Sequence, residues 1–337
     1  MESKDQEYQI TEDHLKEAEK YIEEEEGVTR RLSGWTDHFI TTVAVVMSLF
    51  HLYAALFTIT TQILRGVHVM FVLFLGFLVF PPLKRLRGQI AWYDVFLALL
   101  GAATIIYMLV DFEDFIYRTV TPNRWDIIFG VVIILLIIET TRRSTGFIMP
   151  VVVTTFLVYA YIGPYLPPPW THRGYDFERI IGHMYMTLEG IFGVPIDVSS
   201  TFIILFTIYG AFLEYSGAGK FFIDFSFAAM GKKPTAAGRT VTLASFLLGG
   251  PAGSGVATTV TLGSVAYPML AKAGYDKEAA GGLLAAGGIG AILSPPVLGA
   301  AAFLIAEILK ISYLDVIRMA VIPTILYYWS IFLMVEF

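Results

Sequence analysis

The sequence predicts an all-α, polytopic transmembrane protein that contains a re-entrant helical hairpin and an unwound helix. The hydrophobic fraction is 56%, only 15% of the residues are charged, and the mean hydropathy is +0.66, well above that of soluble domains. Several apolar runs approach the roughly 20 residues that a helix needs to cross a bilayer. Two further apolar runs are interrupted by clusters of Gly, Ser and Pro.

The first 31 residues form an acidic tail. They hold eleven acidic and five basic side chains, a difference that accounts for the whole formal charge of -6. The tail lacks the basic start and the apolar stretch of a cleavable signal peptide. We therefore predict that residues 1–31 are a cytosolic helix or a disordered extension.

Four apolar segments follow and predict a four-helix membrane region over residues 32–145. Basic residues cluster at 84–87 and at 142–143, whereas the loop at 111–114 is acidic. Because Lys and Arg accumulate in cytosolic loops, this alternation predicts a multi-pass protein of a bacterial-type inner membrane with a cytosolic N-terminus. The four segments are residues 35–61, 67–80, 91–110 and 125–138.

A second membrane region is predicted over residues 146–337. Its first span, residues 147–165, ends at a proline cluster, and the polar stretch 171–195 is expected to lie along the outer surface. Residues 198–213 then return to the cytosol. The aromatic segment 221–230 is too short to span the bilayer, so we expect it at the membrane interface.

The first interrupted run contains Gly-Gly-Pro-Ala-Gly-Ser-Gly at residues 249–255. One helix is expected to stop there and another to start near Ser254, which predicts a re-entrant hairpin. Its tip survives in a membrane only when it is buried in protein or faces water. Hydroxyl and carbonyl oxygens there suit Na⁺, and a helix end suits an anion. The candidate residues are Gly253, Ser254, Gly255, Thr258 and Thr259.

The second interruption, at residues 285–296, contains paired prolines that are expected to unwind a spanning helix. Two interruptions within about fifty residues favour one shared binding site. The alternatives are that the small residues only allow close helix packing and that the prolines only kink the helix. The candidate residues of this segment are Gly288, Gly290, Ser294 and Pro295.

Ionisable residues near the apolar segments give weaker signals. Glu139, Glu214 and Glu307 lie at segment ends, which favours interfacial positions, with an ion or proton role as the alternative. His51 and His68 lie within or beside the first two segments. Haem ligation and a proton path are alternatives for them, but we expect interfacial histidines because no matching pair is evident.

Several classes of function are excluded. The chain has no cysteine, which excludes disulfides, thiolate metal sites and cysteine nucleophiles. It has no Gly-x-x-x-x-Gly-Lys pattern for nucleotides and no basic patch for nucleic acid. Ser254 does not fit the Gly-x-Ser-Gly pattern of intramembrane proteases, because Ala252 stands in place of the first Gly. We predict no enzyme activity and no cofactor.

Short motifs recur from residue 165 to residue 307, before, within and after the two interruptions. They are Tyr165-Leu166-Pro167, His172-Arg173-Gly174-Tyr175, Thr187-Leu188-Glu189-Gly190-Ile191-Phe192-Gly193, Gly210-Ala211-Phe212-Leu213-Glu214, Ser216-Gly217-Ala218-Gly219, Gly253-Ser254, Pro295-Pro296, Gly299-Ala300-Ala301-Ala302-Phe303 and Ala306-Glu307. With them the chain resembles the membrane permeases of the tripartite ATP-independent periplasmic (TRAP) transporters. The resemblance is to the TAXI branch with fused small and large subunits, and it covers nearly the whole chain after residue 31.

The resemblance implies that residues 32–145 are a small-subunit-like region and that residues 146–337 begin the large transporting, DctM-like region. It implies symport of a small, dicarboxylate-like organic anion with sodium as the coupling ion, after delivery by a periplasmic substrate-binding protein. The hairpin and the unwound helix would form the sodium and substrate sites, with Ser254 and Gly290 as sodium ligands.

In this family the large region has two inverted repeats, each with one hairpin, and this chain carries one. We therefore expect either a second permease fragment that completes the site or a truncated gene product, because half of a pseudo-symmetric site cannot alternate access alone. The alternatives are a non-transporting membrane scaffold, an inactive permease fragment, and a membrane enzyme. An enzyme would need a histidine or paired carboxylates at membrane depth near the interruptions.

Overall fold

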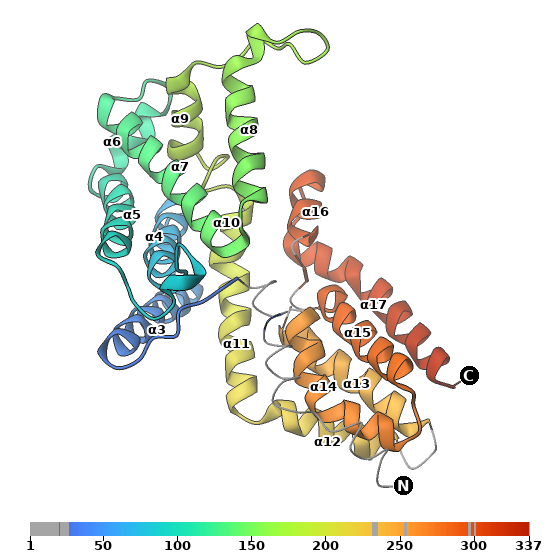
Figure 1. Cartoon of the computed structure of the whole chain (residues 1–337). Coiled ribbons are helices and arrows are strands. Elements are labelled where there is room, and N and C mark those ends of the chain that lie inside the picture. Colours follow the sequence, from blue (N-terminus) through green and yellow to red (C-terminus); the bar gives the residue numbers. More distant parts are fainter. Residues whose placement is uncertain are drawn as a thin grey trace. The chain divides into compact units, whose positions relative to one another are not determined.

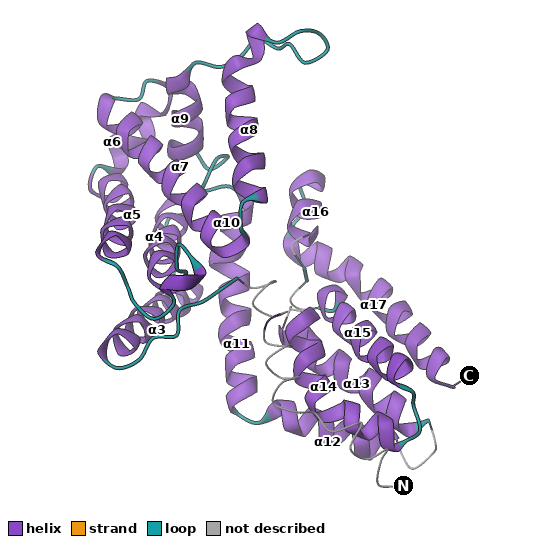
Figure 2. Cartoon of the chain, viewed as in Figure 1, coloured by secondary structure: helices purple, strands orange, loops and turns teal. Residues whose placement is uncertain are grey.

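The computed structural model describes residues 20, 27–230, 235–252, 255–295, 298–299 and 301–336 (Figure 1). In these ranges the chain forms helices and connecting loops and no strand (Figure 2). The predicted all-α, polytopic fold class is confirmed. The chain divides into two compact units, and we call Glu23–Thr201 the N-terminal unit and Phe202–Phe337 the C-terminal unit.

The N-terminal unit contains the four helices that the apolar segments predict and several more. Helix α4 begins at Thr61, six residues before the predicted segment, because Arg65 does not end the helix. Its side chain is buried and lies 2.8 Å from the carboxylate of Asp197. The elements are α3 (Trp35–Leu56), α4 (Thr61–Val79), η1 (Lys84–Leu86), α5 (Trp92–Val110), α6 (Phe112–Tyr117), η2 (Arg118–Val120), α7 (Arg124–Thr145), α8 (Ile148–Ile162), η3 (Gly163–Tyr165), α9 (Phe177–Met186) and α10 (Val194–Val198).

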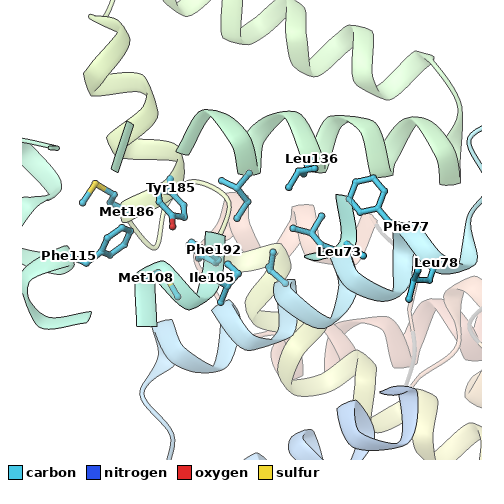
Figure 3. Close-up of a cluster of buried hydrophobic side chains, with 13 residues drawn as sticks. Leu73, Phe77, Leu78, Ile105, Met108, Phe115, Leu136, Tyr185, Met186 and Phe192 are labelled. Atoms are coloured by element: carbon cyan, nitrogen blue, oxygen red, sulfur yellow. The ribbon is translucent and has the colours of Figure 1, made fainter. Parts of the chain in front are cut away.

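A core of large apolar side chains holds α4, α5, α7 and α9 together (Figure 3). Phe77 and Ile105 are fully buried in it, and the hydroxyl of the buried Tyr185 donates to the carbonyl of Thr104. The polar stretch 171–195 is therefore not confined to a surface. Its helix α9 turns Ile181 and Tyr185 into the core, because Gly130 on α7 leaves room for both side chains.

The C-terminal unit contains two helix breaks, each shorter than the sequence predicts, because α13 continues through Pro251 to Ala252 and α15 continues through residues 285–293. Helices α13 and α14 form a hairpin on either side of residues 253–254, and α15 stops at Leu293 before the chain resumes a helix at Ala301. The elements are α11 (Ile204–Tyr215), α12 (Ala218–Met230), α13 (Ala236–Ala252), α14 (Gly255–Lys272), α15 (Lys277–Leu293), α16 (Ala301–Leu309) and α17 (Tyr313–Glu336).

Six helical segments within the described ranges are long and apolar enough to cross a membrane. Helix α7 is not among them although it has 22 residues, because charged residues crowd both of its ends and only residues 127–138 between them carry no charge. The six segments are Trp35–Leu56, Thr61–Val79, Trp92–Val110, Ile148–Tyr165, Val194–Phe212 and Tyr313–Glu336.

Candidate substrate and ion site

The first arm of the hairpin, α13, packs closely against α15. A Cβ atom on Gly287 would collide with the hydroxyl of Ser245, and a Cβ atom on Gly249 would lie only 2.7 Å from that of Ala291. Ser245 is buried and donates to the carbonyl of Val241 at 2.7 Å, which satisfies its hydroxyl within α13. Small residues on both helices therefore bring the two backbones together, as in many membrane bundles.

The second arm, α14, meets the same helix through three of the predicted site residues. The hydroxyl of Thr259 donates to the carbonyl of Gly255 at 2.8 Å. A Cβ atom on Gly288 would collide with both of these oxygen atoms. Gly255, Thr259 and Gly288 thus form one contact, in which a hydroxyl and a carbonyl of the hairpin face the backbone of α15.

Thr258 contributes a buried hydroxyl without a hydrogen-bond partner. Thr258 is 3% exposed, and its Oγ1 has no hydrogen-bond donor or acceptor in the described part of the chain. A buried hydroxyl left unpaired destabilises a fold by about 1–3 kcal/mol. A bound cation or water would satisfy this oxygen, so Thr258 is the residue of the hairpin that points most directly to a ligand.

Two of the predicted residues, Gly290 and Ser294, face α17 near the end of α15. The hydroxyl of the fully buried Ser294 donates to the carbonyl of Gly290 at 2.7 Å and lies 3.5 Å from the hydroxyl of Tyr328. A Cβ atom on Gly290 would collide with the Tyr328 ring. Because residues two apart lie on nearly opposite sides of a helix, Gly288 faces the hairpin while Gly290 faces α17. The predicted residues therefore form two groups.

The backbone at the interruption is well satisfied by its own neighbours. The carbonyl of Ile292 accepts from the Gly299 amide at 2.9 Å, and the Thr324 hydroxyl lies 2.9 Å from the carbonyl of Leu293 and 2.7 Å from that of Ala320, which share its one hydrogen. Pro295, two residues after Leu293, is half-buried. Each carbonyl oxygen keeps a second lone pair, so these atoms remain available to a cation while the interruption is held in place.

Helix α17 supplies polar residues that the sequence analysis missed. Besides Thr324 and Tyr328, the hydroxyl of Tyr327 donates to the carbonyl of Ala286 at 2.7 Å. The signal was present in the sequence, because polar or aromatic hydroxyls at i, i+3 and i+4 in an apolar run mark one face of a helix. That face lies against α15 at its interruption.

The remaining predicted residues fall outside these contacts. Gly253 and Ser254, between the two arms in sequence, lie outside the described residues, so the sodium ligation by Ser254 stays a prediction. The described ranges contain no group of three His, Cys, Asp or Glu side chains that could hold a metal ion. A cation at this site would instead bind carbonyl and hydroxyl oxygens, which are ligands that hard cations accept.

His51 and His68 form a pair, although the sequence showed no matching pair. His51 and His68 are 1% and 3% exposed and are hydrogen-bonded to each other at 2.9 Å. The two residues come from different helices, so their pairing follows from how α3 and α4 pack.

The three glutamates at segment ends are described only in part. Glu139 is one-third exposed and accepts hydrogen bonds from Arg142 and Arg143. The side chains of Glu214 and Glu307 are not described.

Comparison with known proteins finds a family match that covers more than half of the chain, including the whole C-terminal unit. A family profile described as "Tripartite ATP-independent periplasmic transporter, DctM component" matches residues 132–337. A stretch of 109 residues is 32% identical to the 2,3-diketo-L-gulonate TRAP transporter large permease protein YiaN of Escherichia coli K12, over 32% of this chain and 26% of that relative. A stretch of 91 residues is 33% identical to the C4-dicarboxylate TRAP transporter large permease protein DctM of Rhodobacter capsulatus, over 27% of this chain and 21% of that relative. No solved structure matches the chain.

Proposed function

We propose that this chain is a membrane permease component that takes up a small organic anion. The premise is that the chain belongs to the DctM component family of the tripartite ATP-independent periplasmic transporters. The two relatives are named for 2,3-diketo-L-gulonate and for C4-dicarboxylates, both of which carry carboxylate groups. A dicarboxylate-like solute is therefore the proposed substrate class. The relatives are transporter permeases rather than enzymes, in agreement with the expectation of no enzyme activity.

The observation that carries this proposal is the hairpin packed on an interrupted helix. Interrupted helices near the middle of a bilayer offer backbone carbonyls and helix ends to ions and anions. The unpaired, buried hydroxyl of Thr258 lies on the arm that meets Gly288. We place the coupling ion, sodium, at this contact, with the carbonyl of Gly255 and the hydroxyl of Thr258 as oxygen ligands.

The partners and the location are part of the same proposal. A periplasmic substrate-binding protein would deliver the solute, and the chain would lie in the inner membrane with its N-terminus in the cytosol. Residues 32–145 would act as the small-subunit-like region of a TAXI-type fused permease. The family match begins at residue 132, close to the proposed start of the large region at residue 146.

Uptake into proteoliposomes tests the proposal. The chain would be reconstituted with the binding protein and with any permease segment encoded beside it, and uptake of a labelled C4-dicarboxylate would be followed with an inward sodium or potassium gradient. We expect uptake with sodium and only with the binding protein. Equal uptake with potassium would contradict sodium coupling. No uptake in any combination would favour a scaffold or an inactive permease fragment.

A matched pair of variants tests the ion site. Thr258→Val removes the buried hydroxyl without changing the shape of the side chain, and Thr261→Val removes an exposed hydroxyl from the same helix. We expect Thr258→Val to raise the sodium concentration for half-maximal uptake about tenfold, because one ligand interaction contributes roughly 1–2 kcal/mol and 1.4 kcal/mol is a factor of ten. Identical sodium dependence of the two variants would exclude Thr258 as a ligand.

A further inference from the structure

A second polar cluster lies in the N-terminal unit, apart from the hairpin. His51 is on α3 and His68 is on α4, and Nδ1 of His68 lies 2.9 Å from Nε2 of His51. The rings cross at 84°, and both side chains are buried. His51 lies five residues before the end of α3, so the pair is roughly 8 Å along the helix from the turn that joins α3 to α4.

The hydrogen bonds of this cluster run in one direction. The carbonyl of Met47 can only accept, so Nδ1 of His51, 2.7 Å away, must carry a hydrogen. In a neutral His51 ring Nε2 then accepts from Nδ1 of His68. This arrangement leaves Nε2 of His68 as an acceptor, and the hydroxyl of Ser199 lies 3.0 Å from it. With both rings neutral, all three hydrogen bonds are satisfied at once.

We propose that His51, His68 and Ser199 form a site that binds one proton. A proton that adds to Nε2 of His68 releases the Nδ1 proton of that ring toward Nε2 of His51, and the positive charge is shared across the bond between the rings. Ser199 then changes from donor to acceptor, and its own hydrogen turns away from the ring. All three hydrogen bonds remain, with two of them reversed in direction.

A second proton does not fit the same geometry. It would place an N–H group on each ring across the 2.9 Å separation, where neither nitrogen has a lone pair left to accept. Two positive charges at this distance in a buried place would also repel strongly. The geometry therefore limits the pair to a single proton, and the two rings must titrate as one coupled unit.

The charged groups around the pair compensate each other. Arg65 lies one turn before His68 on α4, and Asp197 lies two residues before Ser199, and the two side chains form an ion pair at 2.8 Å. Arg65 also donates to the carbonyl of Phe192 at 2.6 Å. The other titratable groups of the packed segments are more distant in sequence or exposed, namely Asp37, His38 and Tyr53 on α3 and Glu189 before α10.

The position of Ser199 gives the proton a route and an effect. Ser199 is half-buried while both rings are buried, so it forms the more exposed end of the cluster. It also opens the π-helical turn Ser199–Ile203, through which the chain continues into α11. Such turns recur at functional positions in helices. A change of Ser199 from donor to acceptor therefore acts on the segment that joins the two units.

Nitrogen NMR of the full chain in lipid nanodiscs, with ¹⁵N-labelled histidine, tests the proposal. The chain has six histidines, and His51→Gln and His68→Gln assign the two signals that matter. At high pH both rings should be neutral with hydrogen on Nδ1. On acidification one proton should appear across the two rings in a single coupled step, and His51→Gln should turn the response of His68 into that of an isolated ring.

Two outcomes would overturn the proposal. Unchanged nitrogen shifts for both rings over the whole pH range in which the protein stays folded would make the pair a packing contact only. Independent uptake of one proton by each ring would contradict the coupled site. His183→Gln, at an exposed position, is the control and should remove one signal without affecting the pair. None of these readouts depends on transport, so the test holds even if the proposed function fails.

Discussion

Arg143, near the end of α7, donates a hydrogen bond to the Asp94 carboxylate at the start of α5 across 2.6 Å, and both side chains are buried. Arg30 donates to the second oxygen of the same carboxylate at 2.5 Å. Arg143 also donates to Glu139 at 2.8 Å. A basic residue that the sequence assigns to a loop thus stands inside a buried ion-pair network that joins three parts of the N-terminal unit.

The first prediction concerns this network. Asp94→Ala leaves Arg30 and Arg143 buried without their shared counter-charge, and breaking a buried pair in this way destabilises a protein by about 3–5 kcal/mol. Asp315→Ala is the control, because its pair with Arg318 at 2.9 Å is exposed and screened by water, so its loss should matter much less. Thermal unfolding in detergent measures both, and a loss no larger for Asp94→Ala than for the control would contradict the prediction.

The second prediction concerns the contact between the hairpin and α15. Gly288→Ala places a methyl group against the Thr259 hydroxyl and the Gly255 carbonyl, and such overpacking destabilises a core by about 1–3 kcal/mol. Gly281→Ala lies on the same helix with open space around it, so it should be neutral or stabilising by up to about 1 kcal/mol. Unfolding curves and sodium-driven uptake of both variants check this. Equal behaviour of the two would show that the close contact is absent.

The third prediction concerns the interruption after α15. Thr324→Val removes the hydroxyl whose one hydrogen lies between the carbonyl of Leu293 at 2.9 Å and the carbonyl of Ala320 at 2.7 Å, so a part-buried carbonyl loses its donor. We expect a loss of about 1–3 kcal/mol in unfolding free energy. Thr207→Val, which removes an exposed hydroxyl bonded only within its own helix, should change it by less than about 0.5 kcal/mol. A neutral Thr324→Val would mean that other contacts hold the interruption.

The fourth prediction tests the proposed orientation. The chain has no cysteine, so a single cysteine introduced at an exposed position can be labelled without a background. Because the loop at 84–87 is basic and the loop at 111–114 is acidic, Arg85→Cys should be protected from a membrane-impermeant maleimide in spheroplasts, while Glu113→Cys should react. Both should react after permeabilisation. The reverse pattern would place the N-terminus outside.

The positions of the helices and of both interruptions were predictable from the sequence. Apolar runs long enough to span, and clusters of Gly and Pro that stop helices, act on their own neighbourhood. The ends of α5, and the break between Leu293 and Ala301, therefore lie close to where the residues themselves place them. The family resemblance rested on the same local motifs, and the match over residues 132–337 agrees with it at the level of the permease family.

Only the tertiary structure decided which polar residues meet. His51 and His68 belong to different helices, Arg65 pairs with Asp197 in a distant segment, and Gly290 turns toward Tyr328 rather than toward the hairpin. Each of these contacts depends on which faces of two helices are packed together. Hydropathy places a helix along the sequence but leaves its rotation and its neighbours open, because those follow from the packing of all the helices at once.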